Sequence, residues 1–203
     1  MFLLLTETGL TTWQIVICFV VVVAIAFIFV LIKDKINKKK ASTGEDRARV
    51  WGILQKALPE EADLTKAYAC WEWSTYQGRT RTTTYWYYGV AFNEDHLYIA
   101  PLSCKSGNVE SSASYVIRKE DLGMMNSKQG ANWVELYDKN GKEIVSLSVF
   151  AENLKDDKYH PFNLLQKEEA DKFVEWKDKW MESVNAANGV EVTGKMKKPL
   201  KKR

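Results

Sequence analysis

Side chains that carry chemistry are scarce in this sequence. Its 203 residues include only three cysteines and two histidines. It has no Cys-x-x-Cys pair, no Gly-x-Gly and no phosphate-binding loop, which excludes the usual thiol-redox, zinc and nucleotide motifs. His96 lies beside Asp95 and His160 precedes Pro161, and neither histidine stands in a nucleophile context. We therefore expect no catalytic residue, no metal site and no cofactor, and we expect the protein not to be an enzyme.

The composition is typical of a folded protein. Hydrophobic residues make up 46% of the chain and charged residues 27%, and both shares are ordinary for folded proteins. This excludes a wholly disordered chain and a membrane protein with many spans. The length suffices for one domain with a hydrophobic core plus accessory segments, or for two small domains.

One long uncharged run lies near the N-terminus. The segment Trp13–Ile32 has 20 residues without a charge or a proline. As a helix it covers about 30 Å, the hydrocarbon thickness of a bilayer, and a lone span must be helical. A buried core helix is the first alternative, but one so uniformly apolar would be unusual in a small domain. A cleavable signal peptide is the second, but residues 1–12 lack its basic start. We predict a permanent transmembrane helix over residues 13–32.

The charges that flank this run are unequal. Before it the only charged residue is Glu7, whereas residues 33–40 hold five lysines and one aspartate. Because positive charge favours the cytoplasmic side, we expect residues 1–12 outside and the rest as a cytoplasmic domain on the inner or plasma membrane. Residues 33–44 are predicted to form a basic juxtamembrane linker. Its lysines are candidate contacts with the anionic membrane surface: Lys33, Lys35, Lys38, Lys39 and Lys40.

A helical lead-in is expected over residues 45–66. Ser42 has capping-box spacing to Glu45, and Pro59 ends the helix that runs from Glu45 to Leu58. The apolar side chains of this helix form a one-sided stripe, which predicts that one face packs on the domain: Val50, Ile53, Leu54, Ala57 and Leu58.

From residue 67 the apolar period becomes alternating, which indicates β-strands. Turn signals separate six strands, and residues 103–112 are expected to be polar loop. A long amphipathic helix follows, capped by Asn163 and stopped by Asn188-Gly189. Consecutive antiparallel strands followed by a helix predict an α+β domain over residues 67–188. The six predicted strands are 68–76, 82–92, 97–102, 114–119, 132–137 and 143–150.

The order of elements and several segments carry a resemblance to a known family. The segments are Gly89-Val90-Ala91-Phe92 leading to Leu97-Tyr98-Ile99, then Val116–Leu122, Val134–Tyr137 and the closing helix with Trp176 and Trp180. Over roughly residues 68–184 the chain resembles the pleckstrin-homology (PH) superfold, including GRAM-like and bacterial PH-like domains. The resemblance implies a sandwich or open barrel with one of these two tryptophans packed into its end. The family has seven strands, and the seventh is either formed around residues 122–127 or absent.

Two arginines stand at the first predicted turn, in Gly78-Arg79-Thr80-Arg81. PH domains that bind phosphoinositides use basic residues at this hairpin, so the resemblance implies a headgroup or other anion contact by Arg79 and Arg81. The family motif also wants a lysine on the first strand, whereas Lys66 lies outside the predicted strand. The alternative is that both arginines are solvated turn residues.

Large aromatic side chains crowd the two strands of this hairpin. Trp71 and Trp73 lie on the first strand, and Tyr85 and Tyr87 lie on the second. Exposed aromatic clusters mark interfaces, so these four residues form a candidate partner surface. The alternative for the face that carries Tyr85 and Tyr87 is that the 45–58 helix covers it.

The C-terminus is strongly basic, while the domain before it is acidic. Residues 189–203 are predicted to be a disordered tail that lies on the anionic inner leaflet or only improves solubility, with nucleic-acid binding unlikely. Residues 41–194 hold 18 basic and 24 acidic side chains, a net charge of −6. We therefore expect the domain to stand off the membrane, unless the two turn arginines form a local exception. The tail's candidate membrane contacts are Lys197, Lys198, Lys201, Lys202 and Arg203.

Together these features predict a single-pass, non-catalytic membrane protein. Its PH-like domain is expected to bind a protein partner, as a scaffold or for recruitment, or anionic lipid headgroups. Because the anchor already supplies localisation, protein binding is favoured. The alternatives are a structural subunit of a larger membrane complex and an enzyme with unrecognised chemistry.

Overall fold

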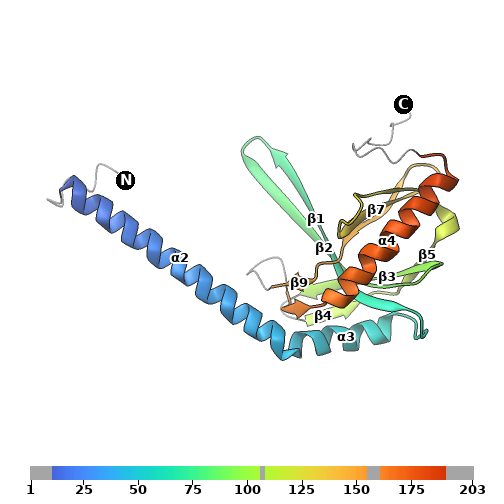
Figure 1. Cartoon of the computed structure of the whole chain (residues 1–203), viewed down its shortest axis with the longest axis horizontal. Coiled ribbons are helices and arrows are strands. Elements are labelled where there is room, and N and C mark those ends of the chain that lie inside the picture. The colour runs from blue at the N-terminus through green and yellow to red at the C-terminus, as the bar shows by residue number, and fades with distance from the viewer. Residues whose placement is uncertain (1–10, 106–107, 155–160, 191–203) are drawn as a thin grey trace.

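The computed structural model of the protein describes residues 11–105, 108–154 and 161–190. A long N-terminal helix leads into an eight-stranded antiparallel sheet, and a C-terminal helix packs on that sheet (Figure 1). The fold is mixed α+β and the sheet is not closed, which confirms the predicted class and the order of its elements.

Helix α2 (Thr12–Thr43) contains the predicted span. No part of its apolar stretch is buried against the rest of the described chain. By length and composition this helix can cross a bilayer, a test that an N-terminal signal sequence also passes. The helix continues without a break through residues 33–43, so the basic segment is helical, and Lys38 pairs there with Asp34 at 3.2 Å.

A single glycine joins α2 to α3 (Glu45–Ala57). Gly44 has a φ of +72°, a left-handed conformation that suits glycine and ends the first helix. The capping box expected at Ser42 does not form, because the Ser42 hydroxyl donates to the Lys39 carbonyl inside α2 at 2.7 Å. Helix α3 is tied to the C-terminal part of the domain, since Asp46 accepts from the Asn163 backbone N–H at 2.9 Å.

Two meanders, β1–β4 and β6–β8, join where β1 pairs with β8, which gives the strand order β4-β3-β2-β1-β8-β7-β6, and β5 pairs with β3. Strand β6 provides the strand that was left open at residues 122–127. Strand β4 lies where loop was expected, because that polar segment pairs back onto β3, with Ser111 opposite Leu102. The strands are β1 (Thr65–Gln77), β2 (Thr80–Phe92), β3 (His96–Lys105), β4 (Asn108–Ser111), β5 (Tyr115–Arg118), β6 (Leu122–Asn126), β7 (Trp133–Asp138) and β8 (Glu143–Ser148).

Short elements connect the sheet to the C-terminal helix. A 3-10 turn, η2 (Lys119–Asp121), precedes β6, and a small separate sheet joins β9 (Glu152–Asn153) to β10 (Leu164–Leu165). Helix α4 (Lys167–Ala187) begins after β10, with Gln166 as its N-cap in place of the expected Asn163. The pairing of β10 with β9 holds residues 164–165 extended, so the helix begins later than its cap signal predicts.

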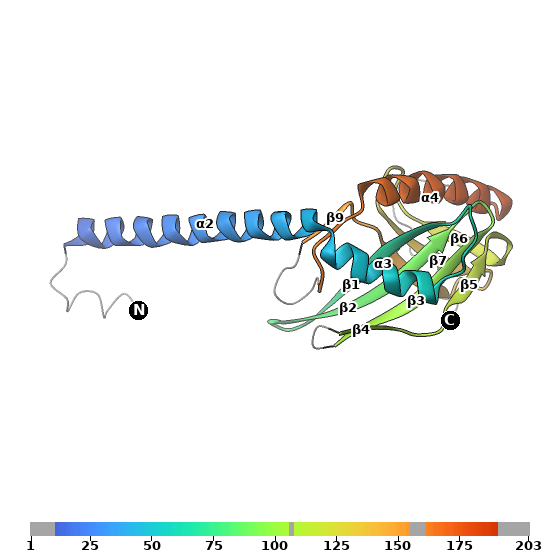
Figure 2. The same ribbon diagram turned by 90° about the horizontal axis from the view of Figure 1, so that it is seen from below.

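Helices α4 and α3 cover opposite faces of the sheet and bury two separate cores (Figure 2). The α4 core includes Phe173, Trp176 and Trp180, and the Phe92 and Trp176 rings lie 5.1 Å apart. The α3 core includes Val50, Leu54 and Leu58 of the stripe predicted from the sequence. Strand β2 contributes to both, because alternate side chains of a strand point to opposite faces.

Candidate functional site

The β1–β2 hairpin is much longer than the sheet that supports it. Its strands pair over their whole length, from Thr65 opposite Phe92 to Gln77 opposite Thr80. The turn is two residues long, and Gly78 adopts a φ of +58° in it. Strand β3 supports β2 only from Tyr87 onward. Within the described residues the outer half of the hairpin, residues 71–86, therefore has no neighbouring strand, and it projects from the domain (Figure 1).

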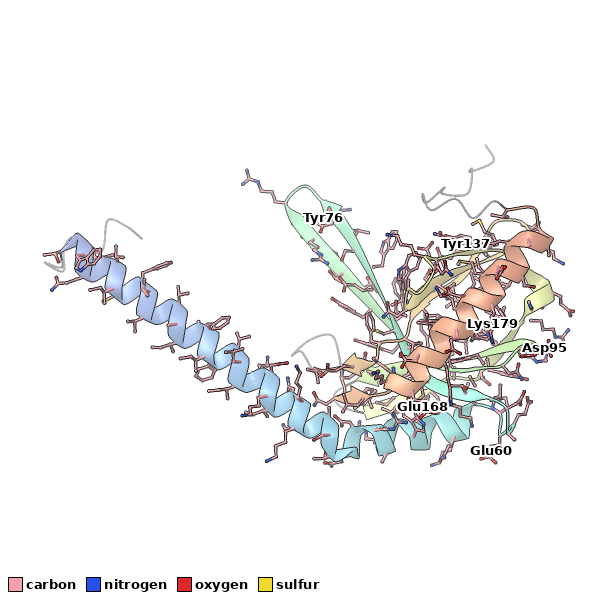
Figure 3. The ribbon with its side chains drawn as sticks, in the orientation of Figure 1. Glu60, Tyr76, Asp95, Tyr137, Glu168 and Lys179 are labelled. Carbon is pink, nitrogen blue, oxygen red and sulfur yellow. The ribbon has the colours of Figure 1, made fainter. Side chains whose placement is uncertain are left out.

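The hairpin projects toward the same side of the domain as α2. Figures 1 and 2, which differ by a quarter turn, both show the hairpin tip and the apolar helix extending in a similar direction. Figure 3 shows Tyr76 near the tip, far from Asp95 at the opposite end of the domain. The end of the domain from which α2 extends thus also carries the hairpin tip.

The tip holds the two arginines predicted as anion contacts. Arg81 donates to Glu72 at 2.8 Å and to Ser74 at 2.9 Å, so its charge is partly balanced by a carboxylate. Its guanidinium also lies 6.0 Å from the ring centroid of Tyr76, which is 70% exposed. Arg79 is exposed at the turn itself. The structure therefore brings both arginines together at one exposed end, with a tyrosine beside them.

The four residues predicted as a partner surface divide between the two faces of the hairpin. Trp71 lies opposite Trp86 in the pairing, while Tyr85 lies opposite Glu72 on the other face. Trp71 and Trp73 therefore share a face with Trp86. Trp86 is not among the four predicted partner residues, although a two-residue turn at Gly78-Arg79 is enough to place it opposite Trp71.

The face with Tyr87 lies partly under α3. Tyr87 is half-buried and packs on the α3 core, and its ring stacks with that of Tyr68 at 6.4 Å. Gly89 allows the close approach of this helix, because a Cβ there would lie 2.3 Å from Leu54 Cδ2. This face was expected either to bind a partner or to lie under the 45–58 helix. At Tyr87 the helix covers it.

The tryptophan face lines a cleft of about 300 Å³ between the hairpin and β8. Trp73 is 54% exposed and Trp86 is 41% exposed. Across the cleft lies Ile144, which is 38% exposed. Neither Ile144 nor its neighbour Glu143 has a sequence signal that links it to the hairpin. The predicted tail contacts, residues 197–203, lie outside the described residues.

The cysteines and histidines form no reactive cluster in the described part of the chain. Burial raises the pKa of Cys70 to about 12 and that of Cys104 to about 11. His96 lines a cavity of about 700 Å³ together with Asp95 and Ser183, but no hydrogen bond joins these three side chains in the described structure. No group of three or more potential metal ligands occurs among the described residues.

The raised pKa values predict slow thiol labelling. At pH 8 the thiolate fraction of Cys104 is about one in a thousand, against about one in four for an ordinary cysteine. We expect a thiol reagent at pH 8 to label Cys70 and Cys104 at least tenfold more slowly in the native protein than in denaturant. Native labelling at the denatured rate would contradict this environment. Peptide mapping of the labelled protein separates both residues from Cys18.

In comparisons with protein families, curated proteins and solved structures, nothing matches this chain. The functional argument therefore rests on the geometry of the helix, the hairpin and the cleft.

Proposed function

We propose that this chain is a single-pass, non-catalytic membrane protein that holds a PH-like binding domain against the cytoplasmic surface of the bilayer. The observation that carries the proposal is the shared direction of α2 and the β1–β2 hairpin (Figures 1 and 2). The two antiparallel meanders, with α4 on one face of the sheet, support the resemblance to the PH superfold.

The lengths of the two projections support a contact between the hairpin tip and the bilayer. From Lys33 to Thr43 helix α2 rises about 16 Å between the end of the apolar segment and the domain. From Trp71 to Gln77 the unsupported part of the hairpin extends about 23 Å back toward the same side. The two lengths are similar, and the two projections run in a similar direction, which supports a position of the tip close to the bilayer surface.

The chemistry of the tip suits an anionic membrane surface. Arginine donates in a fork that matches phosphate, and tyrosine is enriched where water meets lipid. Arg79 and Tyr76 are both exposed at the tip, and Arg81 lies beside them. The lysines of residues 33–40 place a second basic cluster on α2. Two groups of positive charge, one at the hairpin tip and one on α2, thus lie on the side of the domain from which α2 extends.

This arrangement supports a role in recruitment. The helix fixes where the protein is, while the hairpin adds a second contact that limits rotation of the domain. A domain held in this way presents the same surface to every partner that approaches along the membrane. Presenting a surface in a fixed orientation needs no catalytic group.

Fluorescence in nanodiscs tests the proposal. We expect an environment-sensitive fluorophore at Gln77 of the full chain to be quenched by headgroup-labelled lipid when phosphatidylserine is present. The same fluorophore at Lys179, which lies on α4 away from both projections (Figure 3), is the matched control and should not be quenched. Replacing Arg79 and Arg81 by glutamate should lower the quenching at Gln77 several-fold. Equal quenching at both positions, or none at Gln77, would overturn the proposal.

A further inference from the structure

Strands β1 and β8 pair at a single position in the described structure. Cys70 lies opposite Ser148, and no further pair joins these two strands in the described structure. Beyond this pair β1 continues outward in the hairpin while β8 remains in the sheet with β7. Residues 71–77 of β1 and 143–147 of β8 therefore each present a backbone edge without a strand partner among the described residues. Such edges are ready templates for another strand.

The cleft between these edges is apolar and aromatic, with a single charge. Its walls are Trp71, Trp73, Trp86 and Tyr88 on the hairpin and residues 143–146 on β8. Among the described residues that line the cleft, Glu143 is the only charged one, and its carboxylate accepts from the Ser146 hydroxyl at 2.6 Å. The Trp71 and Trp133 rings lie 6.5 Å apart. The hairpin wall thus continues onto the aromatic surface of the sheet.

We propose that an extended segment of a partner protein, carrying large apolar side chains and a lysine or arginine, adds as a strand to the β8 edge of this cleft. The inference deepens the proposed function, because it names the site and the kind of partner that the domain recruits. Main-chain hydrogen bonds to an open edge supply affinity in such strand addition, and alternate side chains supply specificity.

Three features favour this occupant. Open backbone edges need amide and carbonyl partners, which a polypeptide supplies and lipid chains do not. Exposed Trp73, Trp86 and Ile144 offer apolar contacts on both sides of an inserted strand. Glu143 in the cleft and the net charge of −6 over residues 41–194 complement a basic residue on the partner. Aromatic side chains in a cleft are also the usual centres of binding energy.

Panning with the full chain tests the proposal. The probe is a displayed library of random linear peptides, selected against the protein in phosphatidylcholine nanodiscs. We expect enriched peptides to alternate large apolar residues with others and to contain lysine or arginine. Ile144→Lys should weaken the binding of these peptides more than tenfold. Glu143→Lys should weaken the binding of the peptides that contain lysine or arginine by the same factor. Val116→Lys, at a strand position 42% exposed and outside the cleft, is the matched control and should leave binding unchanged.

Backbone methylation separates strand addition from simple apolar binding. One peptide is N-methylated at its odd-numbered residues and a second peptide at its even-numbered residues. One of the two should lose binding and the other should keep it. No enrichment, equal binding to the Ile144→Lys variant, or no effect of methylation in either peptide would overturn the proposal. Two further results would overturn the proposal, because each names a different occupant of the cleft. One is self-association of the chain that Ile144→Lys removes. The other is a shift of tryptophan emission on addition of vesicles that Ile144→Lys removes. These readouts do not involve Arg79, Arg81 or the label at Gln77, so they fail independently of the membrane contact.

Discussion

Replacing Trp180 by alanine is expected to lower the free energy of unfolding of the domain by about 3–5 kcal/mol. Trp180 is 2% exposed, and its ring lies 4.7 Å from that of Trp176. Its Nε1 donates to the Glu94 carbonyl at 2.7 Å, and Trp176 donates to the Asn93 carbonyl at the same distance. The substitution therefore removes a large buried ring and one of two hydrogen bonds that fasten α4 to the β2–β3 turn.

The conservative variant Trp180→Phe separates these two losses. It keeps most of the ring but removes the donor, so a loss near 1 kcal/mol is expected. Denaturant unfolding of the full chain in detergent, followed by circular dichroism of the sheet, measures both variants. A loss below about 1 kcal/mol for Trp180→Ala would show that α4 does not close the core in the way described.

Substitution of Gly123 by alanine is expected to cost about 3 kcal/mol, the upper part of the usual range for overpacking. Gly123 lies at a β-bulge, where the register of β6 against β7 shifts between Leu122 and Met124. A Cβ there would lie 2.4 Å from the Asp138 carbonyl oxygen and 2.7 Å from Lys139 Cα. Both are backbone atoms, so the strand pair itself must move.

Gly52 provides a matched control for this prediction. It lies in α3, and a Cβ there would meet nothing within 4 Å. Gly52→Ala should therefore stabilise the protein by about 1 kcal/mol through helix propensity. The same unfolding measurement should move the two glycine variants in opposite directions. A neutral Gly123→Ala would contradict the tight bulge.

Periodicity predicted the elements because each main element buries one face. The stripe with Leu54 and the alternation around Val90 both reflect contact with a core, and both residues are fully buried. The hairpin was predicted too short at both ends. Residues 65–67 already pair in β1 before the predicted strand begins, while residues 77, 80 and 81 beside the turn have no core to impose alternation. The Gln77-Gly78-Arg79 turn was correct because the left-handed position favours glycine.

The candidate sites were predictable only in part. The sequence places Arg79 and Arg81 beside the turn, and their gathering at the tip follows from a short hairpin loop. The cleft was not predictable, because the meeting of Trp73 with Ile144 depends on where β1 leaves β8. That divergence is a property of the whole sheet, and no local pattern near either residue encodes it.

Helix α2 runs without a break to Gly44. The position and orientation of the domain therefore depend on the number of residues in the juxtamembrane part of this helix. Each residue added between Lys33 and Thr43 would raise the domain by about 1.5 Å and turn it by about 100° around the helix axis. Three added residues would carry the hairpin away from the bilayer by about 4.5 Å, and two would swing its tip to nearly the opposite side of the helix. The length of the juxtamembrane helix thus sets both the height of the hairpin above the lipid and the direction in which the domain points around the helix.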